Sequence, residues 1–241
     1  MAGVDASAQL VQTPAFVLHT RPWRETSLLV EVLSSRHGRL GIIARGLSAS
    51  RAQPLRAALQ PWQWLGLGYV PKGELGQLRS AEALDTAPRM LGPALLPAFY
   101  VNELVLRLVP RQDPLPDLYR AYAEVREQLG EGRGLAWALR RFERDLLAGL
   151  GIGMDLSCDD HGQALQADAC YRLDAERGVC LAPAASRDPV VEGGALLALA
   201  ADRCPDPSAL ASLRLPMRGL LAHHLGPRGL QSWQMATSLA R

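Results

Sequence analysis

Arginines surround a short apolar segment near the N-terminus. In "RLGIIARGLSASR" (residues 39–51), Arg39 and Arg45 bracket the apolar run, and Arg51 follows a loop of small residues. A guanidinium is planar and permanently charged, so it can bind phosphate or carboxylate groups through two parallel hydrogen bonds. The cluster therefore predicts a binding site for an anionic partner.

Charge is unevenly distributed along the chain. The 241 residues have a net charge of only +2. Residues 1–80 contain nine basic and four acidic residues, whereas the remainder contains 17 basic and 20 acidic residues. This asymmetry favours an anionic partner at the N-terminal end. Lys72 is the only lysine, and genome composition explains that preference for arginine equally well.

The basic part must be positioned by strands. Residues 15–84 contain five segments with strand patterning, separated by turn signals. This pattern predicts a small barrel or sandwich over residues 1–84, with residues 1–13 as a flexible lead-in. The five segments are "AFVLH", "SLLVEVLS", "RLGIIARG", "QPWQWLGLGYV" and "GELGQLRSAEAL".

Helical spacing begins near residue 86 and predicts a mostly helical domain over residues 85–241. Residues 155–190 read as an irregular insert that holds three of the four cysteines. Asp206 and Pro207 are typical of a helix N-cap followed by a first-turn proline, and two short helices are expected from there to Gly226. The fold class expected is α+β.

Alternation along residues 39–45 separates two faces. Leu40, Ile42 and Ala44 suit a core, which places Arg39 and Arg45 on the outer face. Basic side chains interleaved with tryptophans on a small barrel are typical of a single-strand binding surface, where arginines follow phosphates and rings stack on bases. A solvated strand face with core tryptophans (Trp62 and Trp64) is an equally good interpretation. The candidate contacts are Arg21, Trp23, Arg24, Arg39, Arg45, Arg51, Arg56 and Arg79.

Motifs for catalysis and metal binding are missing. Asp159, Asp160 and His161 could perform acid–base chemistry, but a polar loop tip is the favoured interpretation. Paired C-x2-C spacing, which lets two thiolates reach one zinc ion, does not occur. We therefore expect no catalytic residue, no metal and no cofactor. The cysteines (Cys158, Cys170, Cys180 and Cys204) are expected to act as small buried hydrophobes.

The N-terminal residues "MAGVDASAQLVQTP" do not resemble a secretory signal, and no apolar run approaches the ~18 residues of a membrane span. Four cysteines without an export signal favour reduced thiols in the cytoplasm.

Six segments, in order, resemble the bacterial RecO family of DNA-repair recombination mediators. They are "FVLHTRPWRETSLLVEV", "HGRLGIIARG", "LQPW", "GELGQLRSAEAL", "YVNEL" and "ALRRFERDLLAGLG", and the resemblance returns in "LRLPMRGLLAHHLGPRGLQS". It implies an OB-fold barrel followed by a helical domain, with no catalytic site. It also implies binding and annealing of single-stranded DNA near the nucleoid.

The resemblance further implies three protein partners, namely the single-stranded DNA-binding protein, RecR and RecA. The family docks the acidic C-terminal tail of the first partner on its helical domain. The first arginine of "RRFE" is implicated there, and it corresponds to Arg140. The expected site is an apolar pocket with a guanidinium at its lip. Its candidate residues are Leu139, Arg140, Arg141, Phe142 and Arg144.

Two departures from the family pattern are visible. Some members have a four-cysteine zinc knuckle, of which this chain keeps Cys158 without the paired spacing. Gln231 and Trp233 stand where the family commonly has basic residues.

Two other functions are compatible with the residues. The chain could be a peptide-docking adaptor with incidental nucleic-acid affinity, in which case removing charge from the barrel leaves its activity intact. A hydrolase using Asp159, Asp160 or His161 is the third hypothesis, and it predicts turnover that is lost in His161→Ala.

Overall fold

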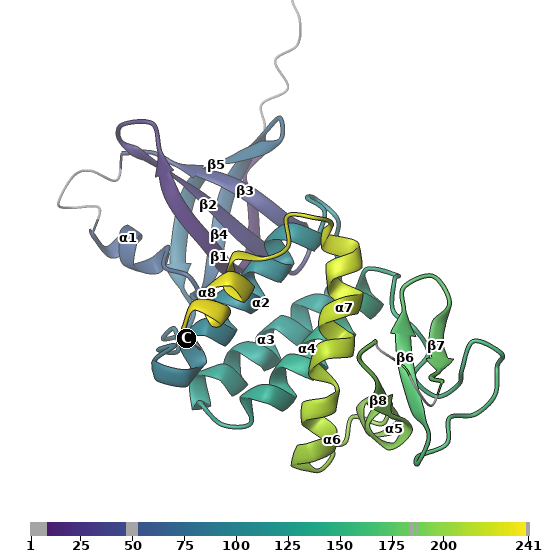
Figure 1. Ribbon diagram of the computed structural model, residues 1–241. Coiled ribbons are helices and arrows are strands. Elements are labelled where there is room, and N and C mark those ends of the chain that lie inside the picture. The colour runs from purple at the N-terminus through teal and green to yellow at the C-terminus, as the bar shows by residue number, and fades with distance from the viewer. Residues whose placement is uncertain (1–8, 47–52, 184–185, 187, 240–241) are drawn as a thin grey trace, which may run out of the picture. The chain divides into compact units, whose positions relative to one another are not determined.

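A computed structural model describes residues 9–46, 53–183, 186 and 188–239 (Figure 1). The chain forms two units. The first consists of Met1–Arg89 with Val109–Arg120, and the second of Met90–Leu108 with Ala121–Arg241.

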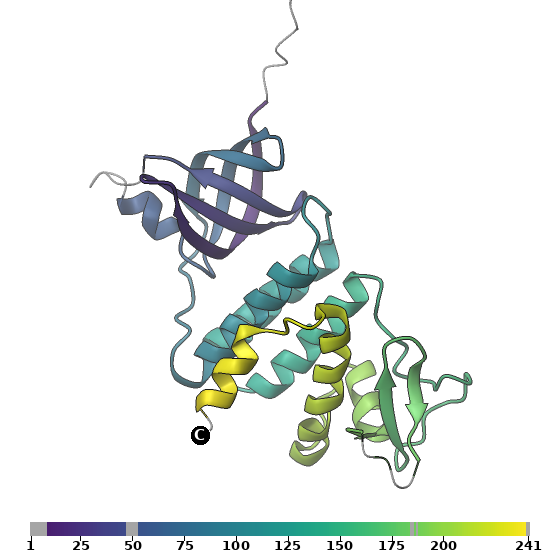
Figure 2. The same cartoon turned by 45° about the horizontal axis from the view of Figure 1, so that its top comes forward.

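Five strands close into a barrel in the order β1-β2-β3-β5-β4, and the short helix α1 lies between β3 and β4 in sequence (Figures 1 and 2). This order confirms the expected five-stranded barrel and is that of a Greek-key OB-fold. The elements are β1 (Val11–Trp23), β2 (Ser27–Ser34), β3 (Gly38–Ala44), α1 (Gln53–Ala58), β4 (Trp64–Lys72) and β5 (Leu75–Ala83).

Alternation decides which side chains fill the barrel. Leu40, Ile42 and Ala44 of β3 are buried in the core, as their spacing predicted. They pair with inward-facing positions of β2, since Val32 lies opposite Leu40 and Val30 opposite Ile42. A slip of one residue would expose this whole set, so the apolar pattern specifies the register.

Close packing explains two strand glycines. A methyl group at Gly76 would lie 2.7 Å from Ile42 Cδ1 and from Tyr69 Cδ2. A methyl group at Gly41 would lie 2.7 Å from Leu75 Cδ2 and 3.2 Å from Arg111 Nη2. Both positions lack room for a side chain because side chains of neighbouring segments already occupy the space.

The expected flexible lead-in was too long. β1 begins at Val11, and Val11, Gln12 and Thr13 pair with β4. The Thr13 hydroxyl is buried and lies 2.9 Å from Ser34 Oγ. The polar residues at 12 and 13 hid this part of the strand in the sequence.

The second unit is built mainly of helices (Figure 1). Its core includes Tyr122 and Phe142, whose rings meet edge to face with centroids 6.5 Å apart. The buried Tyr122 hydroxyl donates to Asn102 Oδ1 at 2.7 Å. The helices are α2 (Leu95–Leu108), α3 (Pro116–Glu131, whose first residues belong to the barrel unit), α4 (Leu135–Gly149), α5 (Gly193–Ala200), α6 (Pro207–Ser212), α7 (Arg214–Leu225) and α8 (Gln231–Leu239), preceded by a 3-10 turn at Gly92–Ala94.

The interpretation of residues 155–190 as irregular was wrong. A hairpin of β6 (Cys170–Asp174) and β7 (Gly178–Leu181) forms there and pairs with β8 (Val191–Glu192). Tyr171 and Val179 are buried against Leu196 and Leu199 of α5. The strands have only four or five residues, too few for alternation to stand out against the surrounding polar residues.

Helix ends in this unit are capped by carboxylates. The Asp206 side chain accepts from Ser208 N (2.9 Å) and Ala209 N (3.1 Å), which confirms the predicted N-cap. At α8, which the sequence did not predict, Glu103 accepts from Gln231 N and from the backbone and hydroxyl of Ser232. The capping carboxylate comes from α2, so no residue close to Gln231 in the sequence marks the start of α8.

Candidate nucleic-acid interface

The outer face of β1, β2 and β3 gathers several predicted residues at one end. Register places Trp23 opposite Ser27, and Arg21 opposite Leu29. Ala44 pairs with Leu28, so Arg45, the next residue along, lies beside the same pair of strands.

β5 extends this group of side chains. It runs parallel to β3 with Ile43 opposite Gln77, which carries Arg79 towards Arg45. Arg79 is the extra residue where the β4–β5 register shifts, a bulge that turns it outward. Arg56 lies in the last turn of α1, which contacts β5. We call Arg21, Trp23, Arg24, Arg45, Arg56 and Arg79 the arginine end of the barrel.

The guanidinium groups of the arginine end are free to meet a ligand. All five arginines are exposed, and none has an ion-pair partner among the residues that the structure describes. Arg21 lies over the Trp23 ring, with its guanidinium carbon 5.7 Å from the ring centroid. Trp23 is half-buried, so one part of its ring remains available for stacking.

A backbone feature shapes the turn between β1 and β2. Arg24 has φ 55°, a left-handed conformation that is uncommon outside glycine, asparagine and aspartate. Conformations of this kind persist where surrounding structure fixes them and are more frequent at functional sites. The turn projects Arg24 from the hairpin end that carries Arg21 and Trp23.

Arg39 lies on the predicted outer face, but its guanidinium already binds other groups of the protein. Its Nη1 donates to Glu31 Oε2 at 3.0 Å, and its Nε donates to Val109 O at 2.9 Å. Only 15% of its side chain is exposed. Burial lowers the pKa of Arg39, and the nearby Glu31 carboxylate opposes that shift.

Arg111 is a residue of this face that the sequence did not suggest. Its Nη2 binds Glu31 Oε1, and its guanidinium crosses Gly41. Gln112 N also donates to Arg39 O at 3.0 Å, so residues 109–113 run along β3. Arg111 lies 80 residues from Glu31 in the sequence, but a strand glycine opposite an outward glutamate was a signal of close approach.

The two tryptophans of "PWQW" do not form a stacking surface. Trp62 is buried, and its φ of 72° places it before the strand rather than in it. Trp64 Nε1 donates to Tyr119 Oη at 3.0 Å, and its ring stacks on Phe16. Both belong to the packing of the barrel unit, as the alternative interpretation held. Arg51 lies outside the described residues.

The predicted tail-binding residues on α4 are more buried than expected. Arg140 is 8% exposed and its Nη2 binds Glu143 Oε1, whereas a guanidinium at the lip of a pocket was expected. The Tyr100 hydroxyl donates to the same Glu143 oxygen at 2.6 Å. Phe142 is buried in the core, and Leu139 is half-buried.

Charges in this buried group remain partly unsatisfied. Arg140 Nε and Glu143 Oε2 are buried without a hydrogen-bond partner. Burial raises the pKa of Glu143, and Arg140 opposes that shift. Burial also raises the pKa of Tyr100 well above its ordinary value, which keeps the phenol protonated and able to donate.

Arg141 and Arg144 both bind the carboxylate of Asp202. Arg141 donates to Asp202 through Nε (2.6 Å) and Nη2 (2.8 Å), and Arg144 Nη2 lies 3.1 Å from the same carboxylate. The hydrogen bond from Arg141 lowers the pKa of Asp202. Within the helix, Arg144 pairs with Asp145 at 2.7 Å, in addition to the pair of Arg140 with Glu143.

Polar residues of the 155–190 segment have structural partners. Asp159 Oδ1 accepts from His161 N and Gln163 N at 2.9 Å, so it closes a turn, as the loop-tip interpretation predicted. Asp160 pairs with Arg177. Within the described ranges, no three His, Cys, Asp or Glu residues are placed to hold a metal ion.

The expectation of buried cysteines was correct only for Cys180. Cys158 is half-buried, and Cys170 and Cys204 are exposed. At the C-terminal end, Trp233 is covered by Arg218, whose guanidinium carbon lies 4.6 Å from the ring centroid. None of the helices in the described part of the chain has the length and apolarity needed to span a bilayer.

A closed five-stranded barrel in this order, with exposed arginines at one end, defines an OB-fold protein. Comparison with known proteins agrees. The family model "Recombination protein O N terminal" matches residues 8–87, and "Recombination protein O C terminal" matches residues 92–234.

Curated relatives match over nearly their full length. DNA repair protein RecO of Stenotrophomonas maltophilia (strain R551-3) is 59% identical over 228 residues, covering 93% of this chain and 95% of the relative. The protein of the same name from Xanthomonas euvesicatoria pv. vesicatoria (strain 85-10) is 55% identical over 230 residues, covering 94% and 96%. The chain belongs to the RecO family of DNA repair proteins. It is a recombination mediator and not an enzyme.

Proposed function

We propose that the arginine end of the barrel binds single-stranded DNA and that the chain anneals complementary strands. The observation that carries the proposal is the group of exposed guanidinium groups beside Trp23, on an OB-fold barrel of a DNA repair family. Phosphate contacts are independent of sequence, and a ring stacks on any base. Both suit a mediator that must handle every strand.

Annealing follows from the same charge. Two strands repel each other through their phosphates, and bound arginines neutralise part of that repulsion and release counterions. Arg39 and Arg111 are left out of the proposed contact set because both are bound to Glu31. Arg51 stays in the set on sequence alone.

The proposal extends to protein partners. The chain helps to load RecA, together with RecR, on strands coated by the single-stranded DNA-binding protein, and works in the cytoplasm beside the nucleoid. Arg140, with Leu139, Arg141 and Arg144, receives the acidic tail of the single-stranded DNA-binding protein, and Phe142 supports this site from the buried side. Family membership supports these partners, and the unpartnered Nε of Arg140 supplies a donor for a carboxylate.

A salt titration tests the DNA site. The slope of log affinity against log salt concentration is negative, and each lost single-strand contact reduces its magnitude by about 0.7. Arg21→Ala/Arg45→Ala is therefore expected to reduce the magnitude by about 1.4. The matched control is Arg133→Ala/Arg228→Ala, which removes two exposed arginines from the second unit. Equal slopes in wild type and the Arg21/Arg45 variant, or an equal loss in the control, would contradict the proposal.

A labelled acidic tail peptide tests the second site. Arg140→Ala is expected to weaken peptide binding by ~1.5–3 kcal/mol, the usual contribution of a charge-assisted contact, and to leave DNA binding intact. The substitution also leaves Glu143 buried without its cation, so Arg140→Met/Glu143→Leu is measured beside it to preserve the fold. Unchanged peptide affinity in the folded double variant contradicts the assignment.

A further inference from the structure

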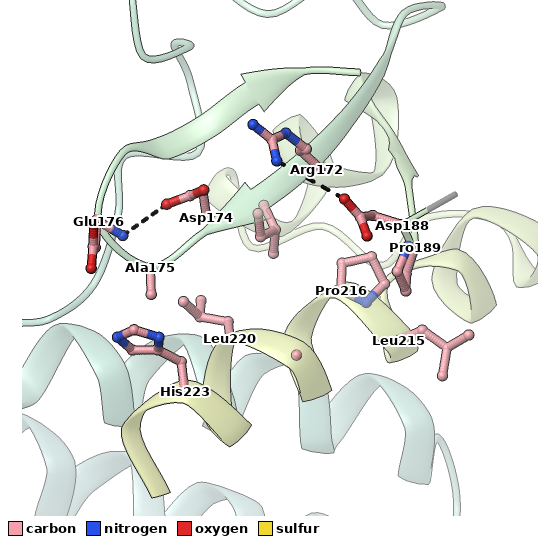
Figure 3. A pocket seen from close by; sticks show the side chains of 12 residues that line it. Arg172, Asp174, Ala175, Glu176, Asp188, Pro189, Leu215, Pro216, Leu220 and His223 are labelled. Carbon is pink, nitrogen blue, oxygen red and sulfur yellow. Dashed lines mark hydrogen bonds and ion pairs between the residues drawn. The ribbon is translucent and has the colours of Figure 1, made fainter. Parts of the chain in front are cut away.

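A groove in the second unit lies between the β6–β7 hairpin and helix α7 (Figure 3). Its volume is about 410 Å³. The helix wall runs from Leu215 to His223, which lies eight residues further along the helix and about 12 Å away along its axis. That length equals about four residues of extended peptide. Its lining includes Asp174, Glu176, Asp188, Leu215 and Leu220.

The floor of the groove is apolar and partly uncovered. Leu215 is 57% exposed, although Pro216 and Leu220 on the same helix are buried. Pro189 adds a further apolar surface on the opposite wall. An apolar side chain from a partner would remove this surface from water.

The rim of the groove carries three carboxylates against one guanidinium, that of Arg172, so its charge is net negative. Asp174 accepts from Glu176 N (3.0 Å) and Arg177 N (3.1 Å), and these backbone bonds lower its pKa and keep it ionised. Glu176 forms no ion pair with any residue that the structure describes. Asp188 approaches Arg172 only at 4.0 Å, and 71% of its side chain is exposed.

The surrounding segment has the same sign of charge. Ten acidic and four basic residues lie between Asp155 and Asp206. Such a field repels nucleic acid and attracts cations. Metal binding lacks a ligand set here, because the described residues bring no three suitable donors together.

We infer that this groove docks a basic peptide segment of a partner protein. One apolar side chain of the segment lies against Leu215 and Leu220, and flanking arginines or lysines meet Asp174, Glu176 and Asp188. Charge complementarity selects the occupant, since the groove combines an apolar floor with a net negative rim. The site is separate from the arginine end and from Arg140.

Fluorescence anisotropy with the full chain tests the inference. The probe is a labelled peptide, Gly-Arg-Leu-Arg-Gly-Gly, at low ionic strength. Asp174→Asn/Glu176→Gln/Asp188→Asn is expected to bind about tenfold more weakly, because each exposed ion pair changes a dissociation constant by roughly 1.5- to 5-fold. Asparagine preserves the acceptor that closes the hairpin turn.

A charge-matched control separates the groove from general attraction. Glu127→Gln/Glu131→Gln/Glu192→Gln removes three exposed carboxylates from the same unit and is expected to bind the peptide like wild type. An equal loss in both triple variants, or no saturable binding by wild type, overturns the inference.

The apolar floor has its own matched pair. Leu215→Ser is expected to weaken binding about fivefold, whereas Leu239→Ser, at a position 78% exposed on α8, leaves it unchanged. A single-stranded oligonucleotide is not expected to displace the peptide. Displacement, or equal binding by the two serine variants, assigns the peptide to another surface and overturns the inference.

Discussion

Glu31 holds two arginines on the outer face of the barrel, and replacing it by glutamine tests that arrangement. Its carboxylate is buried and accepts from Arg39 Nη1 at 3.0 Å and from Arg111 Nη2. In Glu31→Gln both guanidinium groups lose their counter-charge, and one of the two acceptor oxygens is replaced by an amide NH2 that faces a donor. We expect a clear loss of barrel stability.

The size of the loss follows from exposure. A charge-assisted hydrogen bond contributes about 1.5–3 kcal/mol when buried, which applies to Arg39. The Arg111 side chain is 33% exposed, so solvent screening reduces its share to about 1 kcal/mol or less. Together they give a loss of about 2–4 kcal/mol in the free energy of unfolding. For a unit of this size that is a decrease of about 10–20 °C in Tm.

Urea denaturation followed by tryptophan fluorescence measures the effect, because Trp62 and Trp64 lie in the barrel unit. Glu74→Gln is the matched control, since it removes one carboxylate from an exposed turn of the same barrel. If Glu31→Gln unfolds at the same urea concentration as Glu74→Gln, the two ion pairs contribute nothing and the reasoning is refuted.

Three further substitutions test packing, a buried hydrogen bond and pH dependence. Gly76→Ala is expected to lower the free energy of unfolding by about 1–3 kcal/mol, because the added methyl group would lie 2.7 Å from Ile42 and Tyr69. Gly66→Ala, whose added methyl group would have its nearest neighbour 3.8 Å away, is the control and is expected to change it by under about 0.5 kcal/mol. Equal melting temperatures of the two variants contradict this prediction. Tyr100→Phe removes the 2.6 Å bond to buried Glu143 and is expected to cost about 2 kcal/mol in urea unfolding, and wild-type stability would show that the bond is dispensable. Asp202→Asn is expected to be less stable than wild type at neutral pH. Because Arg141 lowers the pKa of Asp202 below its ordinary value of 3.8, the carboxylate stabilises the fold above that value, and this stabilisation is lost as the pH falls through the folded pKa. A stability difference between variant and wild type that persists in acid refutes the pairing.

Short-range patterns predicted the elements whose signal lies within a few residues. Alternation at Leu40, Ile42 and Ala44 identified the barrel face, and Asp206 with Pro207 identified a helix start, because both depend on local geometry. The sequence placed Arg39 on the correct face but could not show its occupation, since its partners include Val109, 70 residues away.

The burial of charged side chains on α4 could not be predicted from the sequence either. Nothing near Arg140 and Glu143 in the sequence indicates that they are buried. The packing of α2 against α4 brings the Tyr100 hydroxyl to the Glu143 carboxylate and removes water. The arginine end was predictable because free arginines need no partner within the chain. The β6–β7 hairpin was missed because its strands are too short for a periodic signal.

The segment from Val109 to Asp113 has a consequence for how this gene can be divided. It follows α2 of the second unit, yet it belongs to the barrel unit, where Arg111 and Gln112 bind residues of β2 and β3. No single cut therefore separates the two units. A fragment ending at residue 89 would leave Glu31 without Arg111 and expose the β3 surface that this segment covers. Exchange of the whole barrel with an unrelated protein would meet the same obstacle, because no contiguous stretch of the gene encodes this unit alone.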